Sequence, residues 1–467
     1  MPATQDQDAP TPDALDVSQA QATVQGDGPI AQGDGAVAVG KGGVYSGGDN
    51  HGVINVDNRK IKIFSQSISR RQFVLVIGAV GGIVALGSIG VIKSLRPRAP
   101  DKMTGEMNVA LARFGVSQPP EAATGFDPGQ ILHDRIAASK AQLKGLQLGS
   151  PELTQEISNA VTASKRAREI NATVLIYGVV SRDGTDDIVV PSFFVSPAEE
   201  GFHLAAELAG EYRLGTPIRG NLRSAGGRSL IADRLQVRAD ALVRIVLGVS
   251  LHKAGEFEKA IQQYEDANRL SEWTDSDGKE VLQFLLAASN YRLRKFDVSI
   301  GHATEALRIS PGYARAYLAL GFNFQQKALE TIRDDPDAAI KLLEDSLIQF
   351  KSAELGAKEL AESDVGIRVV FGRNESQFAL AELKQEDHVD ALIVGYKSVI
   401  DAYGRGERVS LRELAAESYG RLGLLYNRKG DLSLAVESLT NASALHSSPE
   451  RKALFKQQLD ALQGAQK

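Results

Sequence analysis

Apolar residues in the region 103–227 change from strand-like to helical spacing and back. Residues 107–116 are dense in apolar side chains and predict a buried strand. Residues 131–143 carry apolar side chains near helical spacing, which predicts a helix. Pro151, at a first helical turn, opens a second predicted helix that we expect to reach about residue 169.

The same region ends in a predicted hairpin. Residues 171–180 and 188–197 are apolar runs, and the Asp183-Gly184 pair between them is typical of a tight turn. A strand, helices and then paired strands predict a small α/β domain over 103–227, with a sheet covered on one face by helices.

Two stretches of this region resemble the TolB amino-terminal domain family of bacterial envelope modules. Residues 107–110, leading to Phe114, stand where that family has its first strand, and residues 173–178 stand where it has a later strand. The resemblance implies a module that assists protein–protein contact and has no catalytic centre.

From about residue 229 to residue 467 the apolar residues keep helical spacing, and the pattern repeats with a period of 34 residues. Complete copies cover 241–274, 280–313 and 416–449. A further copy begins at Ala314 and contains a six-residue extension before Ala339. Residues 350–405 predict one or two divergent hairpins, and 450–463 predict a capping helix.

Small residues recur where two antiparallel helices must approach closely. These repeat-packing positions are Gly248, Ala260, Ala267, Ala287, Gly321, Gly423, Ala435 and Ala442. A single hairpin leaves an apolar face exposed, so several hairpins must stack. The pattern resembles the tetratricopeptide repeat (TPR) family, which implies an all-α, TPR-like solenoid over 229–467.

The TPR resemblance also implies which side chains meet a ligand, because the inner helices of that family present them. The matching positions here are His252, Lys253, Phe284, Tyr291, Arg292, Leu318, Phe322, Gln325, Gln326, Asn427 and Arg428. Basic and amide groups beside aromatic rings suit an extended peptide with a carboxylate, which arginine can hold bidentately. The full carboxylate-clamp set of chaperone-binding relatives is not present, and an ordinary solvated inner face is the alternative for each residue.

Residues 73–92 form an apolar run of 20 residues without a charge, which as a helix matches the thickness of a hydrocarbon core, about 30 Å. We expect one transmembrane helix, with a buried core helix as the alternative. Basic residues flank both ends almost equally, but residues 69–73 (SRRQF) resemble a twin-arginine export signal. We therefore expect a single-pass protein of the bacterial inner (cytoplasmic) membrane, with its C-terminal portion outside the cytoplasm.

The N-terminal residues form two compositional segments. Residues 1–25 contain no aromatic residue and predict a disordered tail. Residues 26–58 predict a glycine-rich, β-like segment, because small apolar residues alternate between glycines, as in Ala36–Val39. A flexible linker is the alternative, and the β interpretation allows a homo-oligomer to form through 26–58. This segment resembles the glycine-rich preamble of bacterial signalling and conflict proteins.

Composition narrows the function classes. Residues 1–58 hold eight Asp and one Lys, a local charge of −7 within a total of −5, and no basic block follows, so we expect no nucleic-acid partner. The chain has no Cys, and its seven His lack metal-ligand spacing. Gly-x-Ser-x-Gly is absent as well. We expect no metal, no cofactor and no catalytic residues.

These patterns favour a multi-domain, membrane-anchored scaffold or adaptor that binds a protein or peptide through its repeats. The rival hypothesis is a sensor or effector subunit of a bacterial signalling or conflict system. In it the glycine-rich preamble oligomerises and the repeats detect a ligand. An enzyme within 103–227 is disfavoured, because no acid, base and nucleophile converge there in the sequence.

Overall fold

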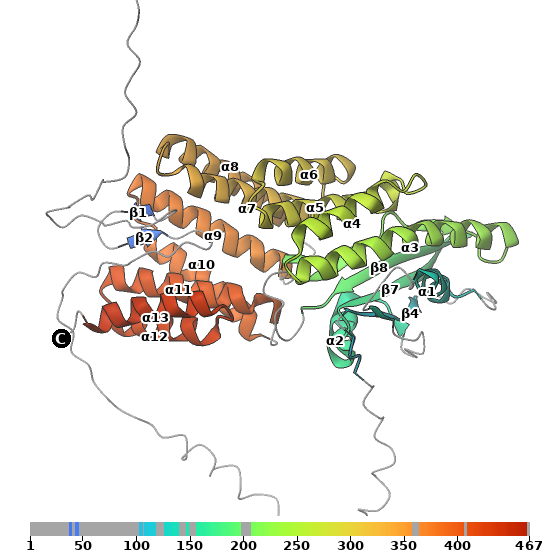
Figure 1. The fold of residues 1–467 in the computed structure, drawn as a ribbon, viewed down its shortest axis with the longest axis horizontal. Coiled ribbons are helices and arrows are strands. Elements are labelled where there is room, and N and C mark those ends of the chain that lie inside the picture. Colours follow the sequence, from blue (N-terminus) through green and yellow to red (C-terminus); the bar gives the residue numbers. More distant parts are fainter. Residues whose placement is uncertain are drawn as a thin grey trace, which may run out of the picture.

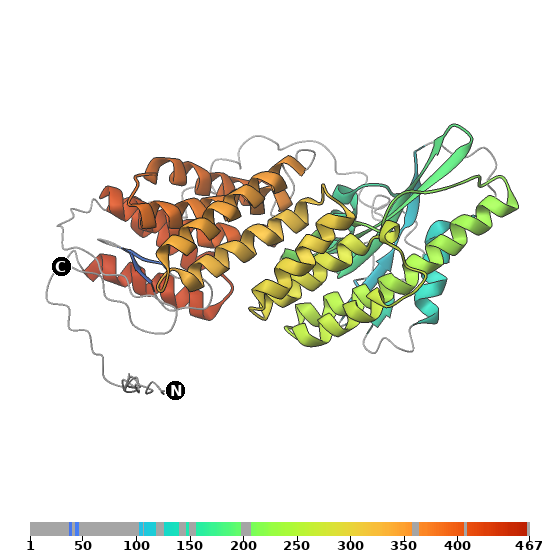
Figure 2. The same cartoon turned by 90° about the horizontal axis from the view of Figure 1, so that it is seen from above.

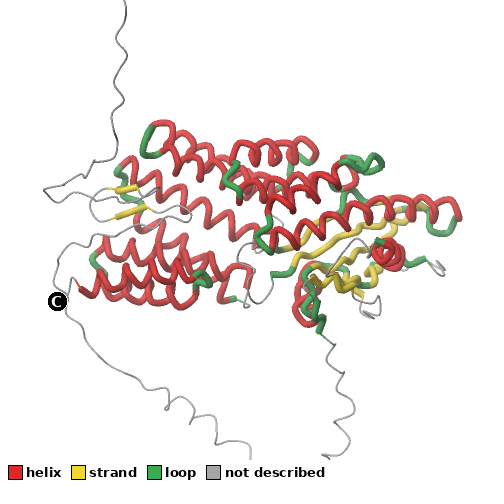
Figure 3. Tube along the Cα trace, in the orientation of Figure 1, coloured by secondary structure: helices red, strands yellow, loops and turns green. Residues whose placement is uncertain are grey.

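The computed structural model shows an α/β region followed by a long series of helices (Figure 1). It describes residues 37–39, 43–45, 102–105, 107–117, 126–139, 146–148, 156–197, 207–356, 364–405 and 409–464. Figure 3 colours the same chain by secondary structure and separates the strands from the helical remainder.

Within the described residues, eight strands form one mixed sheet in the order β10-β8-β7-β3-β5. β4 and β9 extend it by pairing with β7 and β8, and β6 pairs with β4. The strands are β3 (Met107–Leu111), β4 (Arg113–Val116), β5 (Leu146–Leu148), β6 (Glu156–Ile157), β7 (Val174–Asp183), β8 (Asp186–Val195), β9 (Gly210–Arg213) and β10 (Ile218–Gly220). β7 runs parallel to β3 and antiparallel to β8. The predicted hairpin at Asp183-Gly184 is confirmed, because Asp183 pairs with Asp186.

Helices cover both faces of this sheet, so the prediction of one covered face is wrong. Val109 and Leu111 share a core with α1 (Pro128–Ala138) and α3 (Ala225–Lys253). Ala110 and Leu175 point the other way and pack with α2 (Ala160–Ile170). Side chains alternate between the faces of a strand, so two apolar faces need two covers.

The predicted helix from Pro151 to about residue 169 starts later than expected. Residues 156–157 form β6, and α2 begins only at Ala160. The Asn159 side chain accepts a hydrogen bond from the Thr162 N–H at 2.9 Å. Asparagine is a strong helix-capping residue, and this cap sets the start of the helix.

The remainder of the described chain is helical, and the predicted stack of helical hairpins is confirmed. The further helices are α4 (Phe257–Asn268), α5 (Lys279–Arg292), α6 (Phe296–Ile309), α7 (Ala314–Thr331), α8 (Pro336–Gly356), α9 (Asp364–Lys384), α10 (Val389–Gly404), α11 (Arg412–Lys429), α12 (Leu432–Leu445) and α13 (Pro449–Gly464). Each odd-numbered helix from α3 to α11 packs against the even-numbered helix that follows it. The odd-numbered helices also contact one another in succession, and we call them the inner row.

Small residues lie where these helices cross. Gly321 of α7 faces Phe350 of α8, and a Cβ at Gly321 would lie 2.6 Å from that ring. Gly248 faces Tyr264 and Gly423 faces Leu439 in the same way. The repeat-packing alanines are fully buried: Ala260, Ala267, Ala287, Ala435 and Ala442.

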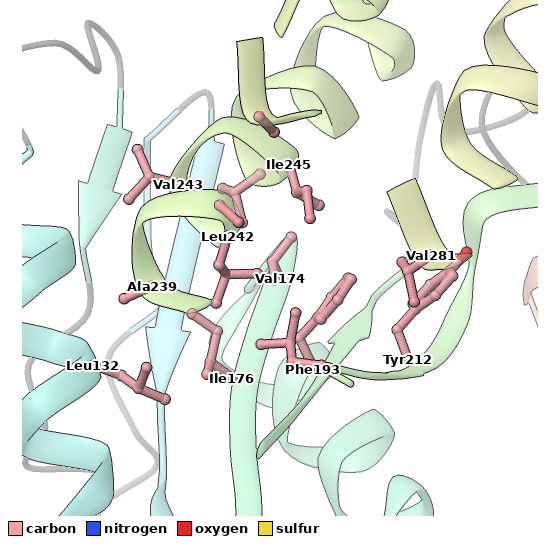
Figure 4. Packing of buried hydrophobic residues seen from close by; sticks show 14 of the residues in the cluster. Leu132, Val174, Ile176, Phe193, Tyr212, Ala239, Leu242, Val243, Ile245 and Val281 are labelled. Atoms are coloured by element: carbon pink, nitrogen blue, oxygen red, sulfur yellow. The ribbon is translucent and has the colours of Figure 1, made fainter. Parts of the chain in front are cut away.

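One hydrophobic core joins the sheet to the first hairpins (Figure 4). α3 is 29 residues long, and its buried positions run from Ile231 to His252. Val174 and Phe193 of the sheet belong to the same core as Ile245 of α3 and Val281 of α5. The C-terminal hairpins, drawn in red, lie at the opposite end of the molecule from the sheet (Figures 1 and 2). α3 therefore serves both as a cover of the sheet and as the first helix of the first hairpin.

Two predictions concern the glycine-rich segment and the N-terminal tail. In the glycine-rich segment, β1 (Val37–Val39) and β2 (Gly43–Tyr45) form a short antiparallel pair. The predicted disordered tail over 1–25 lies outside the described residues.

The membrane prediction requires a correction. Among the residues that the structure describes, no helix combines the length and the apolar character needed to cross a membrane. The segment assigned to the span, residues 73–92, lies outside those residues. On this finding we correct both the fold class with one transmembrane helix and the single-pass inner-membrane localisation.

Candidate functional site

Residues 207–214, which follow β8 in the chain and include β9, lie against the inner row of helices. Three successive inner helices contribute side chains to this contact: His252 comes from α3, Arg292 from α5 and Arg315 from α7. We call the side of α3, α5 and α7 that contacts residues 207–214 the inner face. β9 (Gly210–Arg213) is part of this segment and pairs with β8 of the sheet.

The centre of the contact is the carboxylate of Glu207. Arg292 donates to it through Nε at 2.6 Å and through Nη2 at 2.7 Å, one bond to each carboxylate oxygen. His252 Nε2 lies 3.1 Å from Glu207 Oε1. Burial alone would raise the pKa of Glu207, but the charge of Arg292 and the hydrogen bonds from His252 and Arg292 outweigh it and hold that pKa well below its usual range. Glu207 is therefore an ionised carboxylate held in place by Arg292 and His252.

His252 is held on both sides of its ring. It is fully buried, and its Nδ1 lies 2.8 Å from the Ser289 hydroxyl of α5. Its ring also meets Phe257 edge-on, with centroids 4.9 Å apart. These contacts fix the direction in which Nε2 faces Glu207.

Arg315 holds the backbone of the same segment. Its Nη2 donates to the Ala209 carbonyl at 3.0 Å, and its guanidinium lies 4.3 Å from the centre of the Tyr212 ring. Arg315 itself is only 6% exposed. An arginine over an aromatic face is a favourable cation–π arrangement, and it is strengthened when water is excluded.

Aromatic rings complete the inner face. Tyr212 stacks on Phe193 of the sheet with centroids 4.9 Å apart and meets Phe284 of α5 at 6.2 Å. Phe284 in turn meets Tyr313 edge-on. The Tyr212 hydroxyl donates to the Leu208 carbonyl at 2.8 Å, and burial raises the pKa of Tyr212 to about 12. The ring is thus a neutral, buried anchor.

Three residues expected at the ligand groove, namely His252, Phe284 and Arg292, contact this segment. Lys253, at the end of α3, is half-buried, and burial lowers its pKa. These three expected residues therefore contact a segment of the same chain, and the ligand groove stays a prediction.

Other expected groove residues link helices to each other. Gln325 donates to the Gly372 carbonyl at 3.2 Å and to the Ser376 hydroxyl at 3.0 Å, which ties α7 to α9. Gln326 hydrogen-bonds Tyr291, which ties α7 to α5. Leu318 and Phe322 pack with Phe350 of α8.

Asn427 and Arg428 lie on α11, apart from the first three inner helices. Arg428 forms an ion pair with Glu382 of α9, and its guanidinium lies 5.3 Å from the Phe378 ring. Asn427 is half-buried beside it. Nearby, Arg421 holds Glu375 bidentately at 2.8 and 2.7 Å. Here too, carboxylates of the same chain pair with the inner-row arginines.

Sequence reasoning missed Glu207, Tyr212 and Arg315. Glu207 and Arg292 are 85 positions apart, and no local periodicity links them. Arg315 stands at the second position of a predicted repeat copy, so its place on an inner helix was readable from the spacing. The spacing did not reveal its partner, the Ala209 carbonyl.

The described residues contain no group of three or more His, Cys, Asp or Glu side chains placed to hold a metal ion. Glu207, His252 and Arg292 are engaged with one another, and Arg315 holds a backbone carbonyl. Their arrangement suits holding a polypeptide segment.

Comparison with known proteins gives a limited result. No protein family and no curated protein matches the sequence. Among solved structures, the chain is similar to TTC0263, a thermophilic TPR protein of Thermus thermophilus, at 18% identity and a TM-score of 0.35. The match covers 48% of this chain and 99% of that chain. The assignment of the helical hairpins therefore depends on the helix contacts described above and not on this comparison. The resemblance of residues 103–227 to the TolB domain stays a prediction.

Proposed function

We propose that this protein is an interaction scaffold that holds a protein or peptide segment on the inner row of its helical hairpins. One observation carries the proposal. Side chains from three successive inner helices converge on a short segment and hold its carboxylate, a backbone carbonyl and an aromatic ring together. Inner helices that contact one another in succession bring neighbouring side chains to one segment, which suits this use.

The recognition chemistry is that of peptide binding. A bidentate arginine–carboxylate pair gives direction as well as energy, since both oxygens must be placed. An arginine over a ring and a hydrogen bond to a backbone carbonyl add contacts that an extended segment offers. The partner class that fits is a protein with an accessible acidic segment.

A non-catalytic role agrees with the same residues. His252 is fully buried between Ser289 and Glu207, and Glu207 is fixed by Arg292. A general acid or base needs reach to a substrate proton, and His252 and Ser289 are both fully buried.

The test uses photo-crosslinking in the full chain. A photoreactive residue replaces Gln326 on α7 of the inner row, or Lys259 on α4, whose side chain is 67% exposed. We expect a discrete crosslinked protein from the Gln326 position that is absent or at least about tenfold weaker from the Lys259 position. The full chain is required because α3 is shared with the sheet core.

Equal crosslinking from both positions would mean that the inner row is not the binding surface. No discrete product from either position, with the protein shown to be folded by circular dichroism, would contradict the scaffold role itself.

A further inference from the structure

The inner face of α3, α5 and α7 is already filled by a segment with the chemistry of a ligand. Glu207 supplies a carboxylate to Arg292 and His252, Ala209 supplies a carbonyl to Arg315, and Tyr212 supplies a ring to Phe284. These contacts bridge 45 to 106 positions of sequence, so the segment is brought to the helices by the fold and not by local geometry.

We propose that residues 207–212 are an internal occupant of the inner face, and that an external partner segment with the same chemistry competes with them. The inference rests on the proposed scaffold function and specifies its partner. The partner presents a carboxylate, a glycine three positions later and an aromatic ring five positions later, the spacing of Glu207, Gly210 and Tyr212.

The middle position of this motif follows from the backbone. Gly210 has a φ of +118°, a region that L side chains rarely adopt. A Cβ built there would lie 2.4 Å from Arg315 Nη2. A competing segment with a larger residue at this position would therefore displace Arg315 from the Ala209 carbonyl.

The carboxylate position is set by pairing. Glu207 is the anion that Arg292 holds through both oxygens, and the His252 ring is directed at the same group. Removing the anion would leave a partly buried guanidinium without its carboxylate, which is costly. A second chain that brings a carboxylate to this place would restore the pair.

Covalent attachment favours the internal segment. A tethered segment acts at an effective concentration in the millimolar range, so an external segment with equal contacts does not displace it at lower concentration. Weakening the internal carboxylate removes that advantage while leaving the inner face intact. The internal occupant thus makes the scaffold selective for a segment that carries the anion.

The test compares three full-length proteins: the unaltered chain, Glu207→Gln and Glu211→Gln. The probe is a fluorescent synthetic octapeptide of residues 207–214, ELAGEYRL. Glu211 is the matched control, since it lies in the same segment but accepts from the Tyr177 hydroxyl at 2.6 Å and does not meet Arg292 in the described contacts. Fluorescence anisotropy gives the dissociation constants.

We expect Glu207→Gln to bind the peptide at least about tenfold more tightly than the unaltered chain, and Glu211→Gln to bind it no better than the unaltered chain. A peptide with Gln in place of its first Glu should not bind the Glu207→Gln protein more tightly than it binds the unaltered chain. Adding Arg292→Ala to Glu207→Gln should abolish the gain as well.

Equal peptide affinity for the unaltered chain and a folded Glu207→Gln protein would overturn the proposal. Should Glu207→Gln fail to fold, hydrogen exchange on the unaltered chain decides: peptide at about 10 mM, above the effective concentration of the tethered segment, must accelerate exchange at residues 207–213, and no acceleration overturns the proposal. The proposed scaffold function survives that outcome if Gln326 still crosslinks a partner, so the two failures are distinguishable.

Discussion

At the scale of single residues, His446 is a histidine held between two carboxylates. It lies at the turn between α12 and α13, with Nδ1 3.0 Å from Glu413 and Nε2 3.1 Å from Glu417. Burial alone would lower its pKa, but hydrogen bonds to the two glutamates outweigh that and raise it to about 9. Glu417 also pairs with Arg451 of α13, and its pKa falls to about 2 although burial opposes the shift.

We predict that this cluster makes stability fall in mild alkali. A histidine whose pKa is raised in the folded state stabilises fully below its unfolded value of about 6.5, and the contribution is lost as pH rises through about 9. The expected loss in the free energy of unfolding is about 2 kcal/mol between about pH 7 and about pH 10. Urea denaturation at the two pH values measures it.

His446→Gln should lose most of this pH dependence. The control is His388→Gln, because His388 lies at an exposed position beside Glu386 and should leave the pH dependence unchanged. An unaltered slope in His446→Gln would contradict the assignment. In acid the opposite sign applies: the contribution of Glu417 is present above about pH 4.5 and is lost as pH falls towards about 2.

The residue scale also marks where sequence reasoning ends. The inner positions of the repeats were readable, because helical spacing fixes which side of a helix each residue occupies. Arg292 was named together with its chemistry, a bidentate grip on a carboxylate. The carboxylate itself, Glu207, comes from a loop before β9, and only the complete fold brings it to Arg292.

At the scale of elements, helix crossings depend on small residues. Phe350 of α8 lies between Gly321 of α7 and Gly372 of α9, and a Cβ at either glycine would overlap its ring. We predict that Gly321→Val destabilises the protein by about 1–3 kcal/mol, because the ring must leave a packed position. Thermal or urea unfolding followed by circular dichroism gives the value.

Gly301→Ala is the matched control for this prediction. Gly301 lies in α6 with no atom near its would-be Cβ, so alanine there should be neutral or stabilise by up to about 1 kcal/mol. If Gly321→Val were as harmless as Gly301→Ala, the crossing would not be as close as the structure has it.

Element boundaries were less predictable than element types. The six-residue extension before Ala339 lengthens its hairpin, since α7 has 18 residues and α8 has 21. Residues 350–405 were expected to form one or two divergent hairpins; α8 ends within this range at Gly356, and α9 and α10 form one hairpin. α9 has buried residues on every side, so its sequence lacks the single apolar stripe by which amphipathic helices are recognised.

At the scale of the whole molecule, the predicted boundary between the α/β region and the repeats falls inside a helix and does not divide the core. Residue 229 lies within α3, which begins at Ala225. The hydrophobic core of the sheet continues through α3 into α4 and α5, whereas the later hairpins form separate clusters, the largest of them from α7 to α13. No periodicity of one segment could reveal this, because the shared core arises from contacts between segments.

We predict that the shared core couples the stability of the sheet to that of the first hairpins. Trp273, the one tryptophan of the chain, is buried in this core between α4 and α5 and donates to the Asp277 carbonyl. Its fluorescence therefore reports unfolding of the first hairpins. Leu132→Ala removes a fully buried side chain from α1, under the sheet. We expect it to lower the free energy of unfolding by about 2–4 kcal/mol, so the urea midpoint of the Trp273 fluorescence transition should fall accordingly.

Leu439→Ala removes the same side chain from α12, in the largest cluster of the later hairpins. In a stack of repeats each unit depends mainly on its neighbours, so this change should move the Trp273 midpoint by less than half as much as Leu132→Ala. Circular dichroism of the same samples should detect the Leu439→Ala loss in full. If the two variants shifted the Trp273 midpoint equally, the molecule would unfold as one unit. If Leu132→Ala left it unmoved, the sheet and the hairpins would be independent domains despite α3.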